Sequence, residues 1–155
     1  MGYVHRSVNS ENVIYAASGK VKLIDFGSAI YVGSLDSWAP SPFPWKYQKY
    51  CWIPPESVFF KVYGRQSDVW QAGIFLYELL SGGEHTFRES LEAGDQEKPE
   101  ELEKFVNSRF PLQTALSREC SALLNSMLDL DPKKRPTVER IIANPLLEGM
   151  ELSAN

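Results

Sequence analysis

The sequence predicts a mostly α-helical domain of the α+β class that contains one small β-hairpin. Three patterns lead to this prediction: an unusually apolar helix over residues 67–80, two short β-type runs over 13–16 and 21–24, and helical patterns after residue 117. A chain of 155 residues has room for one modest domain. We therefore expect the other segments to pack around the helix at 67–80.

The segment 67–80 is apolar on nearly all sides, with only Gln71 and Glu78 interrupting the pattern. It is too short and too polar at its ends to span a membrane, so it indicates a helix buried in protein. Ser67 and Asp68 are expected to supply N-cap oxygens at its start, and the glycine pair that follows is expected to end it.

Residues 2–12 are polar and irregular and are predicted to form a loop. The runs 13–16 and 21–24 are separated by Ala17-Ser18-Gly19-Lys20, which predicts a hairpin turn. Asp25-Phe26-Gly27 follows directly, and by itself this tripeptide indicates only a turn.

Two helices are predicted near the end of the chain. Ser117 is expected to cap the first, whose apolar side is made by Leu123, Leu124, Met127 and Leu128. Met127 is interpreted as a core residue rather than a chemical one. The second helix carries Val138, Ile141 and Ile142 and ends before Asn144-Pro145.

Composition excludes several functions. Two cysteines, no signal peptide and no long apolar run indicate a cytoplasmic or a nuclear protein without a membrane anchor. The negative charge is concentrated between residues 84 and 103. This segment contains eight acidic residues and two basic ones, while the whole chain has a net charge of −4. This distribution argues against binding to nucleic acid or to anionic membranes. Most such acidic runs are solvated loops.

Several motifs follow one another in a characteristic order: Arg6, Asn12, the hairpin, Asp25-Phe26-Gly27, Pro54-Pro55-Glu56, the helix start Asp68–Gly73, and the segment 128–137. This order resembles the C-terminal lobe of a serine/threonine protein kinase, of the Pim type within the calmodulin-kinase group. The resemblance covers residues 1–148 and leaves 149–155 as a tail. It implies a kinase C-lobe fold.

The resemblance implies a site for Mg²⁺ and ATP. Asp25 and Asn12 would be the metal ligands, since both offer the hard oxygen donors that Mg²⁺ prefers. Ile14 would form the apolar floor beneath adenine. Without the family resemblance, the sequence indicates simpler roles. Asp25 would be a turn residue, Asn12 would cap a helix or turn, and Ile14 would be a residue of the hairpin core.

Other family positions have structural roles. The resemblance implies that the Asp68 carboxylate binds backbone N–H groups around His5 and Arg6, and that Glu56 forms an ion pair with Arg135. It also implies that Arg6 contacts a phosphorylated activation loop, for which Ser34, Ser37 and Ser41 are alternatives. The family residues with these structural roles are His5, Phe26, Gly27, Glu56, Asp68 and Arg135.

The catalytic loop departs from the family. Ser7 stands where kinases have the aspartate that accepts the substrate proton, and Asn9 stands where they have a phosphate-binding lysine. The family also has a threonine that links those two residues. Lys49 occupies its position in this chain, to within one residue. A serine hydroxyl cannot act as that base near neutral pH without a partner that deprotonates it.

The resemblance begins at the catalytic loop, so we expect the N-terminal lobe, with its glycine-rich loop and strand lysine, to be absent or supplied by another chain. Mg²⁺–ATP binding is then expected to be weak or absent. We interpret the chain as an inactive, pseudokinase-like protein that acts by binding a protein partner or a missing N-lobe. The alternatives are a truncated serine/threonine kinase that transfers the ATP γ-phosphate to protein hydroxyls, and a non-functional fragment.

Overall fold

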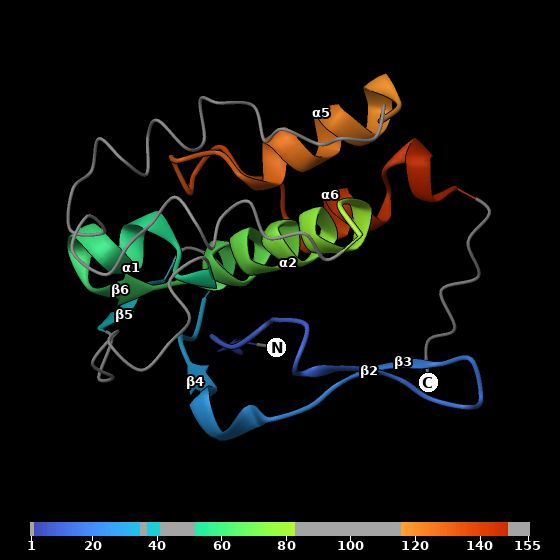
Figure 1. The fold of residues 1–155 in the computed structure, drawn as a ribbon. Coiled ribbons are helices and arrows are strands. Elements are labelled where there is room, and N and C mark those ends of the chain that lie inside the picture. Colours follow the sequence, from blue (N-terminus) through green and yellow to red (C-terminus); the bar gives the residue numbers. More distant parts are fainter. Residues whose placement is uncertain (1, 35–36, 41–51, 83–115, 149–155) are drawn as a thin grey trace.

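The computed structural model describes residues 2–34, 37–40, 52–82 and 116–148 (Figure 1). Its helices are α1 (Pro55–Phe60), α2 (Arg65–Leu80), α5 (Arg118–Met127) and α6 (Val138–Ile142), with single 3₁₀ turns η1 (Phe26–Ser28) and η4 (Pro145–Leu147). Its strands are β1 (Tyr3–Val4), β2 (Val13–Tyr15), β3 (Val21–Leu23), β4 (Ile30–Tyr31), β5 (Ala39–Pro40) and β6 (Val62–Tyr63).

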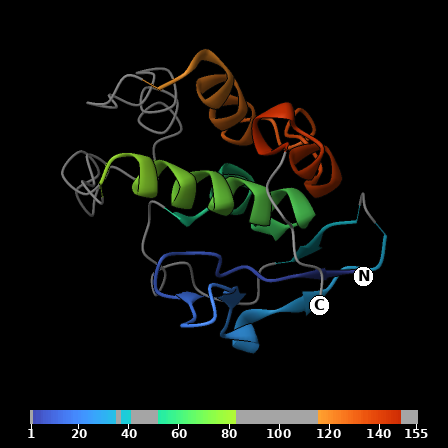
Figure 2. The same cartoon turned by 90° about the vertical axis from the view of Figure 1, so that its right-hand side faces the viewer.

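Helix α2 lies between two layers of the described chain. Figure 2 shows α5 and α6 on one side of it, and the N-terminal loop and strands on the other. Toward α5, a buried cluster joins residues of α2 to the C-terminal segment and to Trp52: Trp52, Trp70, Ile74, Tyr77, Leu124 and Leu128. A Cβ atom added at Gly73 would lie 2.9 Å from Leu128 Cδ2. The glycine therefore allows α5 to pack closely against α2.

The predicted central helix is present, but its start and its burial differ from the expectation. Helix α2 begins at Arg65 after Gly64, so Ser67 and Asp68 lie inside the first turn and the predicted N-cap role is wrong. The Ser67 hydroxyl instead accepts a hydrogen bond from the Gly64 N–H at 3.0 Å, while Asp68 binds another segment. Leu79 is 63% exposed, so the helix is not enclosed on every side.

The described part of the chain contains three two-stranded antiparallel sheets, and the prediction of one hairpin is therefore incomplete. The hairpin itself is confirmed, with Val13 opposite Leu23 in β2–β3. The other two sheets pair β1 with β4 and β5 with β6. Strand β1 lies in the segment predicted to be a loop, because two residues are too few to show the alternation of a strand.

The predicted helices after residue 117 are confirmed. The Ser117 hydroxyl accepts the Cys120 N–H at 3.1 Å and caps α5. The residues predicted to form its apolar side are all buried: Leu123, Leu124, Met127 and Leu128. None of the helices in the described ranges has the length and apolar character needed to cross a membrane.

Candidate functional site

The loop that begins at His5 is fastened to the first turn of α2 by Asp68. The two carboxylate oxygens accept the His5 N–H at 2.7 Å and the Arg6 N–H at 2.8 Å. Burial raises the pKa of Asp68 above the usual aspartate range, while the two backbone donors act in the opposite direction. These are the contacts that the kinase resemblance implies for this aspartate. Arg6 adopts a left-handed backbone (φ 66°), which the sequence did not indicate.

Gln71, one turn further along α2, also binds this loop. Its Oε1 accepts the Val8 N–H at 3.0 Å, and its Nε2 donates to the carbonyls of Arg6 and Trp52, each at 3.1 Å. Sequence reasoning treated Gln71 only as an interruption of an apolar pattern. Its spacing of three residues from Asp68 places both side chains on one helix face, and this was the available signal.

Ser7 is the centre of a neutral hydrogen-bonded cluster. Asn12 Nδ2 donates to Ser7 O at 2.8 Å and to Ser7 Oγ at 2.9 Å. Asn9 Nδ2 donates to the same two atoms at 3.2 and 3.3 Å. The structure thus brings together Ser7, Asn9 and Asn12, three of the residues singled out from the sequence. Lys49 lies outside the described residues.

His5 joins the loop to the Asp-Phe-Gly turn. Its Nδ1 lies 3.3 Å from the Ser7 N–H, which donates to it, and its Nε2 lies 3.1 Å from the carbonyl of Ile24. The neutral tautomer with the proton on Nε2 satisfies both contacts. The Phe26 ring meets the imidazole edge-on, with 4.7 Å between the ring centroids. His5 and Phe26 therefore connect two segments that flank the candidate site.

The two candidate metal ligands lie on adjacent segments, because the Ile24 N–H donates to the Asn12 carbonyl at 2.9 Å. Asp25 is exposed and left-handed (φ 59°), and its Oδ1 accepts the Gly27 N–H at 3.2 Å. With the Asn12 amide nitrogen turned to Ser7, the Asn12 amide oxygen faces away from that contact. One carboxylate and one amide oxygen fit Mg²⁺, which is often held by few side chains together with phosphates and water.

Ile14, the candidate residue beneath adenine, lies opposite Lys22 in the hairpin and is 45% exposed. It is therefore a surface residue of β2 rather than a hairpin core residue. Of the three serines considered in the activation loop, Ser34 and Ser37 are described, and their hydroxyl oxygens lie 2.7 Å apart. Ser41 lies outside the described residues.

Arg6 is buried, with 3% of its surface exposed. Its Nε donates to the carbonyl of Ser28, and its Cζ lies 5.6 Å from the centroid of the Tyr63 ring. Burial lowers the pKa of Arg6, and the nearby Tyr63 and Asp68 act in the opposite direction. The guanidinium group thus connects the loop, the segment after the Asp-Phe-Gly turn, and β6.

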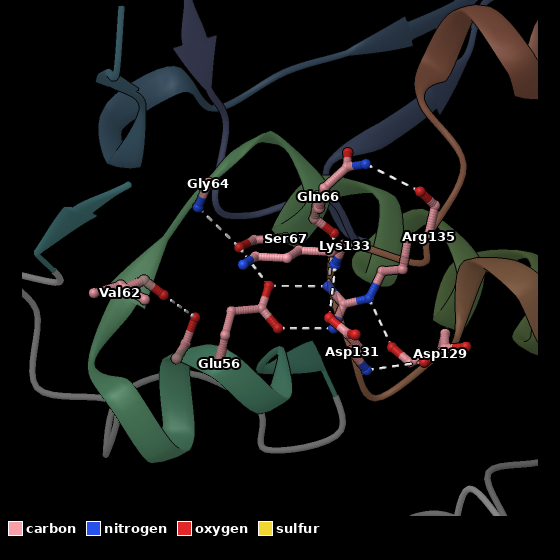
Figure 3. A network of polar contacts seen from close by, with 10 residues as sticks. Glu56, Val62, Gly64, Gln66, Ser67, Asp129, Asp131, Lys133 and Arg135 are labelled. Carbon is pink, nitrogen blue, oxygen red and sulfur yellow. Dashed lines mark hydrogen bonds and ion pairs between the residues drawn. The ribbon is translucent and has the colours of Figure 1, made fainter. Parts of the chain in front are cut away.

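A second polar network surrounds the first turn of α2 (Figure 3). Arg135 Nη2 and Nη1 bind Glu56 Oε2 and Oε1 at 2.7 and 2.9 Å, and both side chains are buried. This bidentate ion pair is the contact that the resemblance implies. The Ser67 hydroxyl donates to Glu56 Oε1 at 2.7 Å, and Arg135 also donates to the carbonyls of Gln66 and Asp129. The network holds α1, α2 and the segment before α6 together.

The arrangement matches a known class of protein. The chain belongs to the protein kinase domain family, whose model matches residues 1–147. Enzymes of this family generally use ATP and Mg²⁺. Residues 5–12 resemble the loop that carries the catalytic groups in that family, and Asp25-Phe26-Gly27 resembles its metal-binding turn.

Particular relatives are serine/threonine kinases or proteins named as kinases. The hormonally up-regulated neu tumor-associated kinase of Homo sapiens is 34% identical over 145 residues, which is 92% of this chain and 19% of that protein. The serine/threonine-protein kinase PEPKR2 of Arabidopsis thaliana is 32% identical over 152 residues, covering 94% and 29%. The probable serine/threonine-protein kinase MARK-A of Dictyostelium discoideum is 31% identical over 150 residues, covering 94% and 13%. The chain spans less than a third of the length of each.

Proposed function

We propose that this chain is a serine/threonine-kinase-like protein that does not transfer phosphate and acts by binding. The observation that carries the proposal is the set of bonds at Ser7. Its hydroxyl oxygen accepts hydrogen bonds from two amide groups, those of Asn9 and Asn12. In the described part of the chain, no carboxylate or imidazole is hydrogen-bonded to that hydroxyl. In our proposal Ser7 therefore does not replace the general base, since a hydroxyl without such a partner keeps its proton near neutral pH.

Asn9 supports the same proposal. Its Nδ2 donates to Ser7, and its Oδ1 accepts the backbone N–H groups of Glu11 and Asn12 at 2.9 and 3.2 Å. A neutral amide that is engaged in this way supplies no positive charge to a transferring phosphate. The two residues that would act on the substrate and the phosphate are thus both neutral and bonded to each other.

The structural contacts that the kinase resemblance implies are present in this chain. Asp68 binds the loop, and Glu56 pairs with Arg135, as described above. We infer from this contrast that the chain corresponds to a Pim-type kinase C-lobe in which catalysis has been lost while the fold has been retained. In this proposal an N-terminal lobe or a protein partner completes the ATP site, and the chain alone binds Mg²⁺–ATP weakly.

Exposed apolar side chains on the loop side of α2 support a binding role. Figure 1 shows the β2–β3 hairpin on this side, away from α5 and α6. Each of the following side chains is more than a third exposed: Tyr3, Ile14, Tyr15, Val21, Leu23, Ile24, Phe26 and Tyr31. Large exposed apolar surfaces commonly mark interaction sites. We propose that a polypeptide partner binds here.

The alternative function is that of an active serine/threonine kinase that transfers the ATP γ-phosphate to protein hydroxyls. One observation favours it, namely that Asn12 and Asp25 remain on adjacent segments with oxygen donors suited to Mg²⁺. If bound there, the metal ion would neutralise charge on the phosphates of ATP. The two functions differ in whether Ser7 supports phosphate transfer.

The decisive experiment joins this chain to a Pim-type N-terminal lobe and measures γ-phosphate transfer to a basic peptide. General-base catalysis typically raises the reaction rate by a factor of ~10²–10⁴. We expect no measurable transfer by the chimera with Ser7 intact, and transfer after the combined replacement Ser7→Asp, Asn9→Lys and Lys49→Thr. Adding Asp25→Ala to the triple variant should abolish its activity, which controls for contaminating kinase. Robust transfer by the chimera with Ser7 intact would establish the alternative.

A binding measurement on the chain alone completes this test. Isothermal titration with ATP, with and without Mg²⁺, should show little or no heat of binding. A low-micromolar affinity that depends on Mg²⁺ and is lost in Asp25→Ala would contradict the expected weak binding.

A further inference from the structure

We propose that Gln71 is a positioning residue that fixes the backbone on both sides of Ser7 and couples it to the segment that begins at Trp52. A displacement of either segment is then transmitted to the other through one side-chain amide. This inference does not depend on whether the chain transfers phosphate.

The three hydrogen bonds of Gln71 select particular backbone groups. The Arg6 carbonyl belongs to the peptide unit before Ser7, and the Val8 N–H belongs to the peptide unit after it. Both peptide units that flank Ser7 are therefore held by one planar amide group. The third bond, from Nε2 to the Trp52 carbonyl at 3.1 Å, extends this connection to a segment about 45 residues further along the chain.

The chemistry of glutamine fits this position closely. The side chain is 1% exposed, and both of its N–H donors are used along with its oxygen acceptor. An amide buried without such partners would be destabilising. A carboxylate at the same place could accept the Val8 N–H but could not donate to two carbonyls, and a serine hydroxyl has only one O–H donor for those two carbonyls.

Asp68 does not provide this connection. It holds the loop through the N–H groups of His5 and Arg6, upstream of Ser7. Within the described hydrogen bonds, only Gln71 contacts both the loop and Trp52. The two residues therefore have different roles. Asp68 holds the start of the loop, and Gln71 fixes the position of Ser7 relative to Trp52.

The segment at the other end of this connection is well packed. Trp52 is 5% exposed and belongs to the core cluster with Trp70 and Tyr77. Pro54 and Glu56 follow it at the start of α1, where Glu56 is held in the ion pair. A ligand that shifts this segment would thus move the Trp52 carbonyl, and through Gln71 it would move Ser7.

Nuclear magnetic resonance of the isotope-labelled 155-residue chain tests this proposal in the parent protein. We expect scalar couplings through the hydrogen bonds between Gln71 Nε2 and the carbonyl carbons of Arg6 and Trp52. We also expect slow hydrogen exchange at the Val8 amide. Absence of the coupling to Trp52 would overturn the proposal even if no variant folds.

Transmission is tested with Trp52→Phe, using the side-chain amide resonances of Asn12 as the reporter of Ser7. We expect this substitution to shift those resonances in the parent background and to have no effect on them in Gln71→Met. Gln66→Met is the matched control, because Gln66 lies on the same helix and donates to the Arg135 carbonyl at 3.1 Å without touching the loop. In that background the Trp52→Phe shift should persist.

Gln71→Glu separates positioning from general stability. It keeps an acceptor for Val8 but removes the donated bonds, so Val8 should remain protected from exchange while the response to Trp52→Phe is lost. If the response to Trp52→Phe persists in Gln71→Met or Gln71→Glu, Gln71 is only a structural residue and the proposal fails.

Discussion

Two polar networks lie next to helix α2. One contains charged side chains, and the other contains neutral ones. At the first turn, Glu56 and Arg135 are both charged, both buried and bonded to each other. In the loop, Ser7, Asn9 and Asn12 are neutral and partly buried. The comparison shows charged side chains in the contacts that hold the elements together and neutral side chains at positions 7, 9 and 12 of the loop.

The difference has a physical basis. A buried charge that loses its partner is strongly destabilising, so neither member of the Glu56–Arg135 pair can be changed alone without a large cost. The loop residues are neutral and satisfy one another through amide and hydroxyl groups. A loop of this kind keeps its shape without any charged residue at position 7 or 9.

The largest expected effect comes from breaking the charged network. Glu56→Ala should lower the free energy of unfolding by about 3–5 kcal/mol, because Arg135 is left buried without its counter-charge. This is a large part of the roughly 5–15 kcal/mol that stabilises a typical domain. Denaturant unfolding followed by tryptophan fluorescence measures the change.

Two further variants serve as controls for that measurement. Glu148→Ala, at an exposed position, should change stability by less than about 0.5 kcal/mol. The double variant Glu56→Ala with Arg135→Ala should lose less than the sum of the two single losses, since the pair is removed together. Additive losses would show that the ion pair contributes little and would weaken the contrast between the networks.

An intermediate effect is expected at Ser67. Its hydroxyl donates to Glu56 and accepts the Gly64 N–H, so Ser67→Ala leaves that buried N–H without its partner. We expect a loss of about 1–3 kcal/mol in the free energy of unfolding. Ser126→Ala is the matched control, because that hydroxyl only donates to the Leu123 carbonyl in its own helix. Equal losses in the two variants would contradict the role given to Ser67.

Much of this architecture could be predicted from the sequence. The hairpin follows from its two runs and turn, and helix α5 follows from Ser117 and its apolar side. The contacts of Asp68 with the loop and of Glu56 with Arg135 were expected only through the family resemblance. Neither follows from local pattern, because the partners lie more than 60 residues apart in the chain.

Other features could not be predicted. Strands β1, β4, β5 and β6 have two residues each, too few for the period of two to be visible. The left-handed backbones of Arg6 and Asp25 are fixed by the contacts around them and have no glycine to indicate them. Gln71 was visible as a polar residue in an apolar helix, but its partners depend on how the loop and Trp52 are placed in space.

The smallest effect should come from the neutral loop. Asn9→Ala removes the acceptor for the N–H groups of Glu11 and Asn12 as well as the bonds to Ser7, and should cost about 0.5–1.5 kcal/mol. Asn9→Asp keeps that acceptor and loses only the donated bonds, so it should recover most of the loss. The same unfolding measurement compares the two variants. If Asn9→Asp is as destabilised as Asn9→Ala, the bonds to Ser7 stabilise the loop more than its turn does. A loss as large as that of Glu56→Ala would show that the loop, though uncharged, is as important to the fold as the ion pair.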